Sequence, residues 1–525
     1  MKRNWLLGIA GMIVLALLTW SRIRLIDSLP DQGYFAKYTI VADQILSGHI
    51  PRDRLLDFSP LYLWFIVAMR AIGGGFHAVR TLQIVFVSVA AILVAIAARR
   101  FGPIAIIVAP ILLLGSRGAL VCATELEPET LILLFNAASL AALERNQLLA
   151  GLFLGLSATC RPVALLVVVA LAIAMRSWRL IAGALGPVVI ILIVNLSLTG
   201  EMTLMDPGTV FYEGMNPNAA GYEGVQPRIV NDLERQSRDP DYLHVAYRVV
   251  AARALGHPVR RSESNRYWMT KGLAFARAYP LAALRLTARK FYFALHSYDA
   301  YDLSTMARKN FLLAQRLFIP FGVIVALALV AIILRVRGIA PLVIFTCAFG
   351  VTLVIFYVTA RQRNALLPSL VILAATGLAE IVARRHIAAA VIAAVIAMLL
   401  TINGPAQRED AAGWLGERNQ FDKAIALEQQ GRWAEADALL ARLEQEGYRP
   451  IRENRAVSSI AYYRAVAAAH LGQPRAAVLQ LLARANAENP GNEHILAALG
   501  DPLLFQLHDP FTARRALLAA RQQGM

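Results

Sequence analysis

The chain has 525 residues, of which 58% are hydrophobic and 17% are charged. A soluble globular domain usually has about 45–50% apolar and about 25% charged residues, so this composition excludes an ordinary soluble protein. The formal charge of +17 comes largely from Arg at the ends of apolar segments, as expected for the cytoplasmic side of a membrane protein. No stretch interleaves Lys and Arg with aromatic residues as a nucleic-acid groove requires, so nucleic acid is not an expected partner.

The N-terminus begins with Met1-Lys2-Arg3 and an apolar run that continues to about Trp20. This run lacks a small-x-small cleavage site, so we expect a retained first membrane helix and not a cleaved signal peptide. The cysteines lie in or beside apolar segments and show no metal-ligand spacing. We therefore interpret them as buried small hydrophobic residues; they are Cys122, Cys160 and Cys347.

Apolar segments recur from residue 5 to residue 402, and a run of about 18 or more apolar residues is typical of a membrane-spanning helix. The long candidates are 5–26, 80–98, 103–116, 128–143, 147–160, 163–175, 180–198, 312–334, 339–359, 364–383 and 387–402. A shorter run, 58–72, has the length of a re-entrant or interfacial segment. The segments that meet at Arg161-Pro162 form either a tight hairpin or one broken helix. The sequence predicts an all-α polytopic membrane domain over residues 1–403, with about 11–13 membrane segments.

Basic clusters at the segment ends predict the orientation of this domain. They are Lys2/Arg3, Arg99/Arg100, Arg145, Arg176/Arg179, Arg335/Arg337 and Arg384/Arg385. Placing all of them on the cytoplasmic face requires that 58–72 does not cross completely. The first external loop (27–57), a large insertion (200–311) and everything after residue 403 then share the outer face. We therefore expect a multi-pass protein of the bacterial inner membrane, with its functional face and C-terminal region in the periplasm.

The outer face collects ionisable residues close to apolar runs, which is costly and indicates a functional site. They are Asp31, Asp57, Glu125, Glu127, Arg161, Glu201, Asp206, Arg361 and Arg363. The alternative is that each residue anchors a helix end at the lipid headgroups. In the 200–311 insertion, the stretch 279–295 alternates apolar and basic residues, so it forms either an interfacial amphipathic helix or a helix of a soluble subdomain.

The composition changes after residue 403. Residues 404–420 read as a linker, and residues 421–525 resemble tetratricopeptide repeats through Gly431-Arg432-Trp433, Leu471-Gly472 and the alanines that follow each. The two glycines are 41 positions apart in the numbering, against the usual 34, so either the connecting loop is longer or one repeat is irregular. A third, poorer unit is expected over about 493–523. Such a stack either binds a protein partner or caps the membrane domain.

The first external loop carries the most specific pattern. Asp31 follows Pro30 at a turn, an amphipathic helical pattern runs to Gly48, and Asp57 precedes Ser59-Pro60-Leu61-Tyr62. This order resembles the first external loop of the C-type glycosyltransferase superfamily, which uses polyprenyl-phosphate sugars. The nearest members are the protein O-mannosyltransferases and the aminoarabinose transferases that modify lipid A. The family's acidic pair is Asp-Glu, and Gln32 departs from it, which removes one carboxylate.

Three later stretches extend the resemblance over roughly residues 1–400. "ATELEPETLILLF" is similar to the family's acidic motif, with Glu127 as the best match, and "GLFLGLSATCRPVALL" to its Gly-rich helix ending in a basic residue and Pro, with Arg161 in the basic position. "RQRNALLP" is similar to a late Arg-x-x-x-x-Pro element. The tetratricopeptide-like tail lies outside the core pattern of the family.

The resemblance implies transfer of a sugar from a polyprenyl-phosphate carrier to a hydroxyl of a glycan, lipid or protein acceptor on the outer face. Asp31 is the candidate general base. Basic groups should stabilise the phosphate leaving group, and the candidates are Arg161, Arg361 and Arg363. Direct attack by the hydroxyl would invert the anomeric configuration.

Further site residues follow with less specific signals. Tyr34, Tyr62 and Glu125 are candidate substrate-binding residues. No cofactor is certain, but Asp57 and Glu127 are candidate oxygen ligands of Mg²⁺ or Mn²⁺. Two other functions stay open: a transporter or flippase for lipid-linked glycans, although no internal duplication is visible, and an envelope assembly scaffold in which residues 404–525 carry the function.

Overall fold

The computed structural model describes residues 16–25, 36–52, 54–204, 207–222, 224–227, 229–231, 233, 243–300, 306, 309–310, 313, 317–384, 386–402, 414–446, 448, 459–488, 495 and 498–499. These residues form helices joined by turns, and no strand occurs among them. One isolated parallel β-bridge pairs Tyr222 with Val358. The prediction of an all-α protein is confirmed for this part of the chain.

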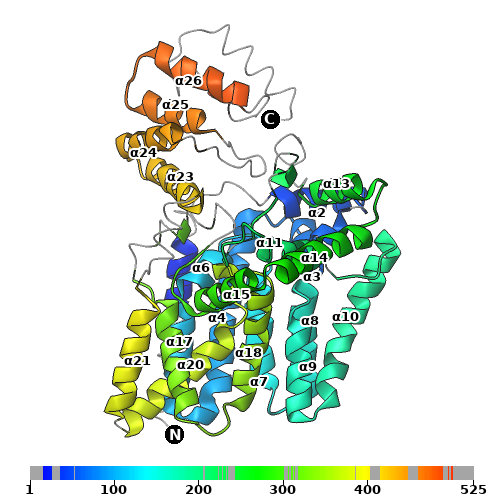
Figure 1. Cartoon of the computed structure of the whole chain (residues 1–525). Helices are drawn as coiled ribbons and strands as arrows, with labels where there is room; N and C mark the ends of the chain where they lie inside the picture. Colours follow the sequence, from blue (N-terminus) through cyan, green and yellow to red (C-terminus); the bar gives the residue numbers. More distant parts are fainter. Residues whose placement is uncertain are drawn as a thin grey trace.

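The apolar helices described between residues 76 and 399, apart from the 200–311 insertion, form a bundle (Figure 1). Its helices are α4 (Phe76–Ala98), α5 (Pro103–Leu114), α6 (Arg117–Ala123), α7 (Glu129–Ala142), α8 (Gln147–Cys160), α9 (Ala164–Met175), α10 (Trp178–Thr199), α17 (Phe321–Ile333), α18 (Ala340–Ile355), α20 (Leu367–Arg384) and α21 (Ile387–Leu399). The short 3₁₀ helix η2 (Arg99–Phe101) extends α4. They form where the sequence predicts apolar segments, because long apolar runs without charged residues favour buried helices.

Two of the described helices are long and apolar enough to cross a membrane, Phe76–Phe101 and Trp178–Thr199. A third crossing is possible if α5 and α6, which are bent by 54° at residues 115–116, act as one span. The remaining apolar helices are shorter: a 14-residue helix such as α8 is about 21 Å long, against about 30 Å for the hydrocarbon core.

The helix ends separate into two groups. At one end of the bundle, Arg100 at the end of α4 contacts Glu144 after α7. At the same end, the Ser177 hydroxyl lies 2.5 Å from Oε1 of Gln147, so the end of α9 returns to the start of α8. Helices α8 and α9 therefore form a hairpin with Arg161 at its turn, and the alternative of one broken helix is wrong.

Helix α3 (Pro60–Ala71) keeps both of its ends at the opposite end of the bundle. Ser59, just before it, donates a hydrogen bond to the Cys160 carbonyl at the tip of α8. After it, only Ile72 to Gly75 separate it from the first turn of α4, where Arg80 donates to the Thr124 carbonyl at 2.8 Å. Segment 58–72 therefore does not reach the end of the bundle that carries Arg100. This agrees with the predicted orientation, which requires that the segment does not cross completely.

Glycines let α8 and α10 pack backbone to backbone. A Cβ added at Gly183 would lie 2.0 Å from the Leu148 carbonyl oxygen, and one added at Gly151 would lie 2.2 Å from the Leu180 carbonyl oxygen. Gly155 continues the stripe one turn later, where a Cβ would lie 2.5 Å from the Ala184 carbonyl oxygen. Small residues at four-residue spacing are how apolar helices approach closely in a membrane.

The 200–311 insertion covers the end of the bundle opposite Arg100 (Figure 1). Its described helices are α11 (Pro207–Gly214), α13 (Leu243–Leu255), α14 (Arg261–Ala278) and α15 (Pro280–Leu295). Trp268 on α14 is buried against Tyr212 and Tyr247, with ring centroids 4.8 and 4.9 Å away. The short α2 (Ala36–Leu46), the 3₁₀ helix η1 (Leu55–Asp57) and α19 (Ala360–Arg363) lie at the same end.

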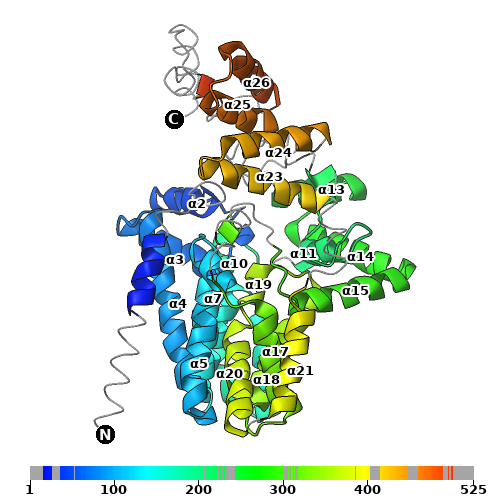
Figure 2. The same cartoon turned by 90° about the vertical axis from the view of Figure 1, so that its left-hand side faces the viewer.

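Four further helices are described after residue 403 (Figure 2). They are α23 (Trp414–Gln429), α24 (Trp433–Gln445), α25 (Ile460–His470) and α26 (Arg475–Glu488), and each packs on the next. Gly431 and Gly472 close the turns within the two pairs with φ of +74° and +68°, a conformation that favours glycine. Both turns are short, so the extra length between the glycines lies between α24 and α25. The predicted third unit, 493–523, falls almost entirely outside the described residues.

Candidate functional site

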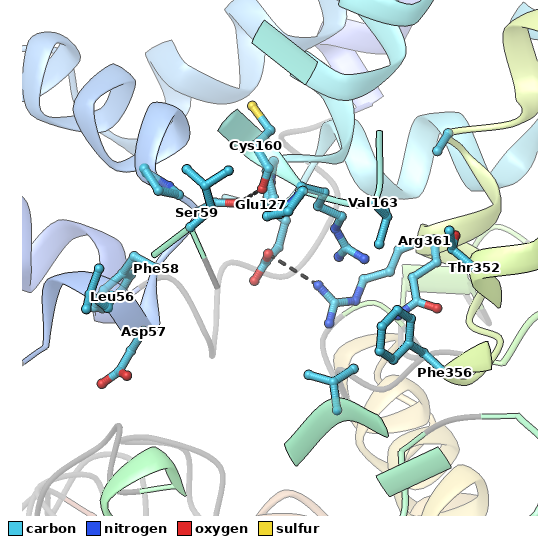
Figure 3. Close-up of a pocket in the computed structure, with 18 of the residues that line it drawn as sticks. Leu56, Asp57, Phe58, Ser59, Glu127, Cys160, Val163, Thr352, Phe356 and Arg361 are labelled. Carbon is cyan, nitrogen blue, oxygen red and sulfur yellow. Dashed lines mark hydrogen bonds and ion pairs between the residues drawn. The ribbon is translucent and has the colours of Figure 1, made fainter. Parts of the chain in front are cut away.

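A cavity of about 200 Å³ lies at the end of the bundle beneath the insertion (Figure 3). Segments far apart in the sequence line it: the start of α2, η1 and the start of α3, the α6–α7 loop, the α8–α9 turn, α13, α14, the end of α18, and α19. Its charged lining residues are Lys37, Asp57, Glu127, Arg161, Arg261 and Arg361. Its cationic side chains outnumber its carboxylates, so the cavity is suited to an anionic ligand.

Two carboxylates and two guanidinium groups form a connected network, and all of its members except Glu129 line the cavity. Nη1 of Arg361 lies 3.4 Å from Oε2 of Glu127 and 3.4 Å from Oε1 of Glu129. Nη2 of Arg161 donates to that same Oε1 of Glu129. Figure 3 shows the Glu127 carboxylate pointing across the cavity toward Arg361. Arg361 therefore lies between two acidic groups, and Glu129 joins it to Arg161.

The local sequence explains how the two arginines reach the cavity. Pro162 disfavours the helical conformation for the residue before it, and Arg161 accordingly has φ −143° and ψ 114° at the end of α8. Arg361 lies on α19, which the Thr359 side chain caps by accepting a hydrogen bond from the Gln362 amide at 3.3 Å. The end of α8 at Pro162 thus fixes the backbone of Arg161, and the Thr359 cap of α19 fixes the backbone of Arg361.

A second ion pair closes the side of the cavity that faces the insertion. Nη1 of Arg261 lies 2.6 Å from Oδ1 of Asp57, and Nη2 of Arg261 donates to the Leu56 carbonyl at 2.8 Å. Both side chains are buried, with 7% and 0% exposed. The first turn of α14 is therefore anchored to the segment that begins α3.

Burial raises the pKa of the Glu127 carboxyl to about 7, although Lys37 and Arg361 lower it; Glu129 raises it further. Glu127 lies in the loop between α6 and α7. Its Oε1 atom is buried and has no hydrogen-bond partner among the described residues. The side chain therefore has an oxygen that a ligand hydroxyl in the cavity could satisfy.

Apolar side chains form the wall of the cavity nearest the bundle. Phe349, Leu353 and Phe356 come from the last turns of α18, and Val163 comes from the α8–α9 turn. Because polar groups and an apolar wall face the same space, the cavity can accommodate a ligand with a charged head and an apolar tail.

The structure brings together four of the predicted site residues: Asp57, Glu127, Arg161 and Arg361. Asp31 and Tyr34 lie outside the described residues. Lys37, six positions after Asp31 in the sequence, is buried and lines the cavity.

The other predicted residues do not line this cavity, and their contacts explain why. Arg363 is 3% exposed and binds Asp299 at 2.5 Å together with the carbonyls of His296 and Tyr298, so it fixes the loop after α15. Glu125 is paired with Lys309 at 2.5 Å in a fully buried position. The predicted phosphate contact of Arg363 and substrate contact of Glu125 do not agree with these placements.

Tyr62 is also buried away from the cavity. Its hydroxyl donates to Oε1 of Gln83 on α4 at 2.7 Å, and its ring lies 5.0 Å from that of Tyr38 in an edge-on arrangement. It therefore supports the neighbouring Tyr38, which does line the cavity.

The suggested ligands of Mg²⁺ or Mn²⁺ are not brought together as a metal site. Asp57 is paired with Arg261 and Glu127 with Arg361, and Figure 3 shows the Asp57 carboxylate pointing away from Glu127. Among the described residues, no group of three or more His, Cys, Asp or Glu side chains could hold a metal ion. The Asp57 and Glu127 carboxylates are each paired with a guanidinium group, and their arrangement does not fit a divalent cation.

Three cavity or network residues were not predicted: Lys37, Glu129 and Arg261. Glu129 had a usable signal, because it lies two residues after Glu127 and follows a proline at a helix start, where a negative charge is favourable. Arg261 had none, since its ion-pair partner Asp57 lies in another segment of the chain.

Comparisons with protein-family models, curated proteins and solved structures found no match to this chain.

Proposed function

We propose that the chain is a membrane glycosyltransferase that moves a sugar from a polyprenyl-phosphate carrier to a hydroxyl acceptor. One observation carries the proposal. Ser59-Pro60, Glu127, Arg161-Pro162 and Arg361 come from the four separate sequence stretches that resemble C-type glycosyltransferases, and all of them line one cavity. Unrelated likenesses would have no reason to converge on one place.

The charges and the apolar wall support a lipid-phosphate donor. Arg161 and Arg361 offer planar groups suited to a phosphate, and negative charge develops on that phosphate as the sugar leaves. The apolar residues of α18 suit the first isoprene units of the carrier. Glu127, with its unsatisfied Oε1, accepts a hydrogen bond from a hydroxyl of the sugar or the acceptor.

The reaction is a single displacement. The acceptor oxygen forms a bond to the anomeric carbon while the bond from that carbon to the phosphate oxygen breaks. Asp31 takes the hydroxyl proton, and the polyprenyl phosphate leaves with the electron pair. The anomeric configuration inverts. No metal ion is required by this scheme, because the cationic side chains carry the leaving-group charge.

The bundle belongs, in this proposal, to a multi-pass inner-membrane domain with the cavity on its periplasmic side. Among the described residues, Arg100, Arg145, Arg176 and Arg335 lie at the end opposite the cavity, which agrees with the cytoplasmic bias of Arg and Lys. Several helices expose large apolar side chains that water would not favour; examples are Ile107 at 61%, Ile173 at 73% and Ile190 at 62%. Lipid contact explains this exposure.

The four helices α23–α26 act, in this proposal, as tetratricopeptide-like repeats that bind a protein partner or the acceptor. Their two pairs each turn at a glycine of positive φ and stack in order along the chain. A scaffold function alone predicts that the cavity residues are dispensable.

The test is sugar transfer by purified protein in nanodiscs, with a panel of polyprenyl-phosphate monosaccharides and a membrane extract as acceptor. Asp31→Asn and Glu127→Gln should reduce donor turnover by at least about 100-fold, as expected for loss of a general base or of a group that contacts the reacting sugar. The control is Asp43→Asn, an exposed carboxylate paired with Arg70 on α3. Equal turnover in Asp31→Asn and wild type would remove Asp31 from the reaction, and donor turnover by neither protein across the panel would refute the proposed activity.

A further inference from the structure

Glu129 has no role in the proposed reaction so far, yet it is the group that joins the two cavity arginines. Its side chain is 2% exposed. One of its oxygens, Oε1, accepts from Arg161 and lies 3.4 Å from Nη1 of Arg361. Two guanidinium groups so close together repel each other, and burial strengthens that repulsion. A shared carboxylate oxygen removes the conflict and fixes both groups in one place.

The two arginines depend on Glu129 to different degrees. Arg361 also reaches Glu127, at the same 3.4 Å. The only acidic contact of Arg161 among the described residues is Glu129, and Arg161 is the more exposed arginine, at 21% against 15%. Loss of Glu129 would therefore release Arg161 toward solvent while Arg361 stayed beside Glu127.

We propose that Glu129 is a positioning residue that holds Arg161 and Arg361 together as a two-armed clamp for one phosphoryl group. The proposal rests on the proposed function, because it takes the phosphate of a polyprenyl carrier as the ligand. Glu129 does not touch the ligand. The buried Oε2 of Glu129 has no hydrogen-bond partner among the described residues, so its contacts are concentrated on the oxygen that the arginines share.

A simple electrostatic effect predicts the opposite result, which makes the proposal sharply testable. Removing a negative charge near an anion site should tighten anion binding. If Glu129 only adds negative charge, Glu129→Gln will bind phosphate more tightly. If it positions the clamp, the same variant will bind more weakly, because the phosphate loses one charged hydrogen-bonding partner. The expected loss is about 10-fold or more in Kd.

The experiment measures equilibrium binding of radiolabelled undecaprenyl phosphate to the full-length protein in nanodiscs. Undecaprenol, which lacks the phosphate, and excess phosphatidylglycerol separate phosphate recognition from binding of the tail or of any anionic lipid. The variants are Glu129→Gln, Glu129→Asp and the control Asp43→Asn. The control removes an exposed carboxylate that does not line the cavity, so it should bind undecaprenyl phosphate as tightly as wild type, whereas Glu129→Asp should recover part of the affinity.

A double-mutant comparison shows whether Glu129 acts through Arg161. Arg161→Gln should weaken phosphate binding, and adding Glu129→Gln to it should cost much less than Glu129→Gln alone. If Glu129→Gln does not fold, the clamp is tested with Arg161→Gln, Arg361→Gln and the double variant. A clamp predicts that loss of either arginine alone removes most of the selectivity for undecaprenyl phosphate over undecaprenol.

The outcomes separate the two proposals. If the wild-type protein binds undecaprenol with the same affinity as undecaprenyl phosphate, the proposed donor is refuted. Wild type that selects the phosphate, with Glu129→Gln equal or tighter, leaves the donor in place and overturns the positioning role. Full additivity of Arg161→Gln and Glu129→Gln also overturns it.

Discussion

Replacing Glu127 by glutamine should make the stability of the protein less sensitive to pH. The carboxyl group has a pKa of about 7 in the folded chain, against an ordinary value of 4.5. Between these values the folded state holds a proton that the unfolded state has lost, so stability falls as the pH rises. Because one pKa unit corresponds to about 1.4 kcal/mol, the full loss by pH 8 is about 3 kcal/mol.

The assay is thermal unfolding of wild type and Glu127→Gln in detergent, followed by tryptophan fluorescence at pH 5 and pH 8. Glutamine keeps the shape of the side chain and does not ionise. The difference in melting temperature, Glu127→Gln minus wild type, should therefore be several degrees higher at pH 8 than at pH 5. Asp43→Asn, which removes an exposed carboxylate, should show no such trend. A difference that stays constant with pH would show that Glu127 ionises near its ordinary value, and the account of its burial would fail.

Two further predictions concern packing and ion pairing. Gly183→Ala should destabilise the protein by several kcal/mol, because its Cβ would press on the backbone of α8. Gly186→Ala on the same helix should be tolerated, because no heavy atom lies within 4 Å of its added Cβ. The two variants are compared by their yields of monodisperse protein. Asp57→Asn should cost about 3–5 kcal/mol because it removes the carboxylate that is ion-paired with the buried Arg261 guanidinium. Adding Arg261→Met to Asp57→Asn should recover much of that loss. The two single variants and the double variant are compared by thermal unfolding, and a double variant that loses the sum of the two single losses would contradict the prediction.

Helix positions followed well from the sequence, because apolar runs, prolines and basic ends are local signals. The turn between α8 and α9 falls at Arg161-Pro162, where the proline disfavours the helical conformation for the residue before it. The predicted segment 103–116 ends close to the end of α5, but the short helix α6 (Arg117–Ala123) that follows it at an angle was not predicted. A Cβ at Gly115 would lie 2.5 Å from the Ile319 side chain, so a neighbouring segment packs where the chain turns.

The candidate site was predictable only in part. Glu127, Arg161 and Arg361 were found because each belongs to a recognisable short pattern. Their partners were not, because no periodicity connects Asp57 with Arg261 or Glu129 with Arg161. Arg363 and Glu125 looked equally suitable in the sequence, and only the fold shows that each buried side chain is held by a counter-ion of opposite charge. A charged residue beside an apolar run therefore indicates a constrained position, and the fold decides whether it faces a ligand.

Photoaffinity labelling tests the central claim, that this cavity holds the phosphate end of a polyprenyl carrier, most directly. Undecaprenyl phosphate with a diazirine next to the phosphate would be irradiated with wild-type protein in nanodiscs, and the labelled peptides identified by mass spectrometry. The account predicts label on segments 57–62, 160–163 and 349–365, which excess undecaprenyl phosphate removes. Label confined to the lipid-exposed surfaces of α10 and α21, unchanged by that competitor, would contradict it.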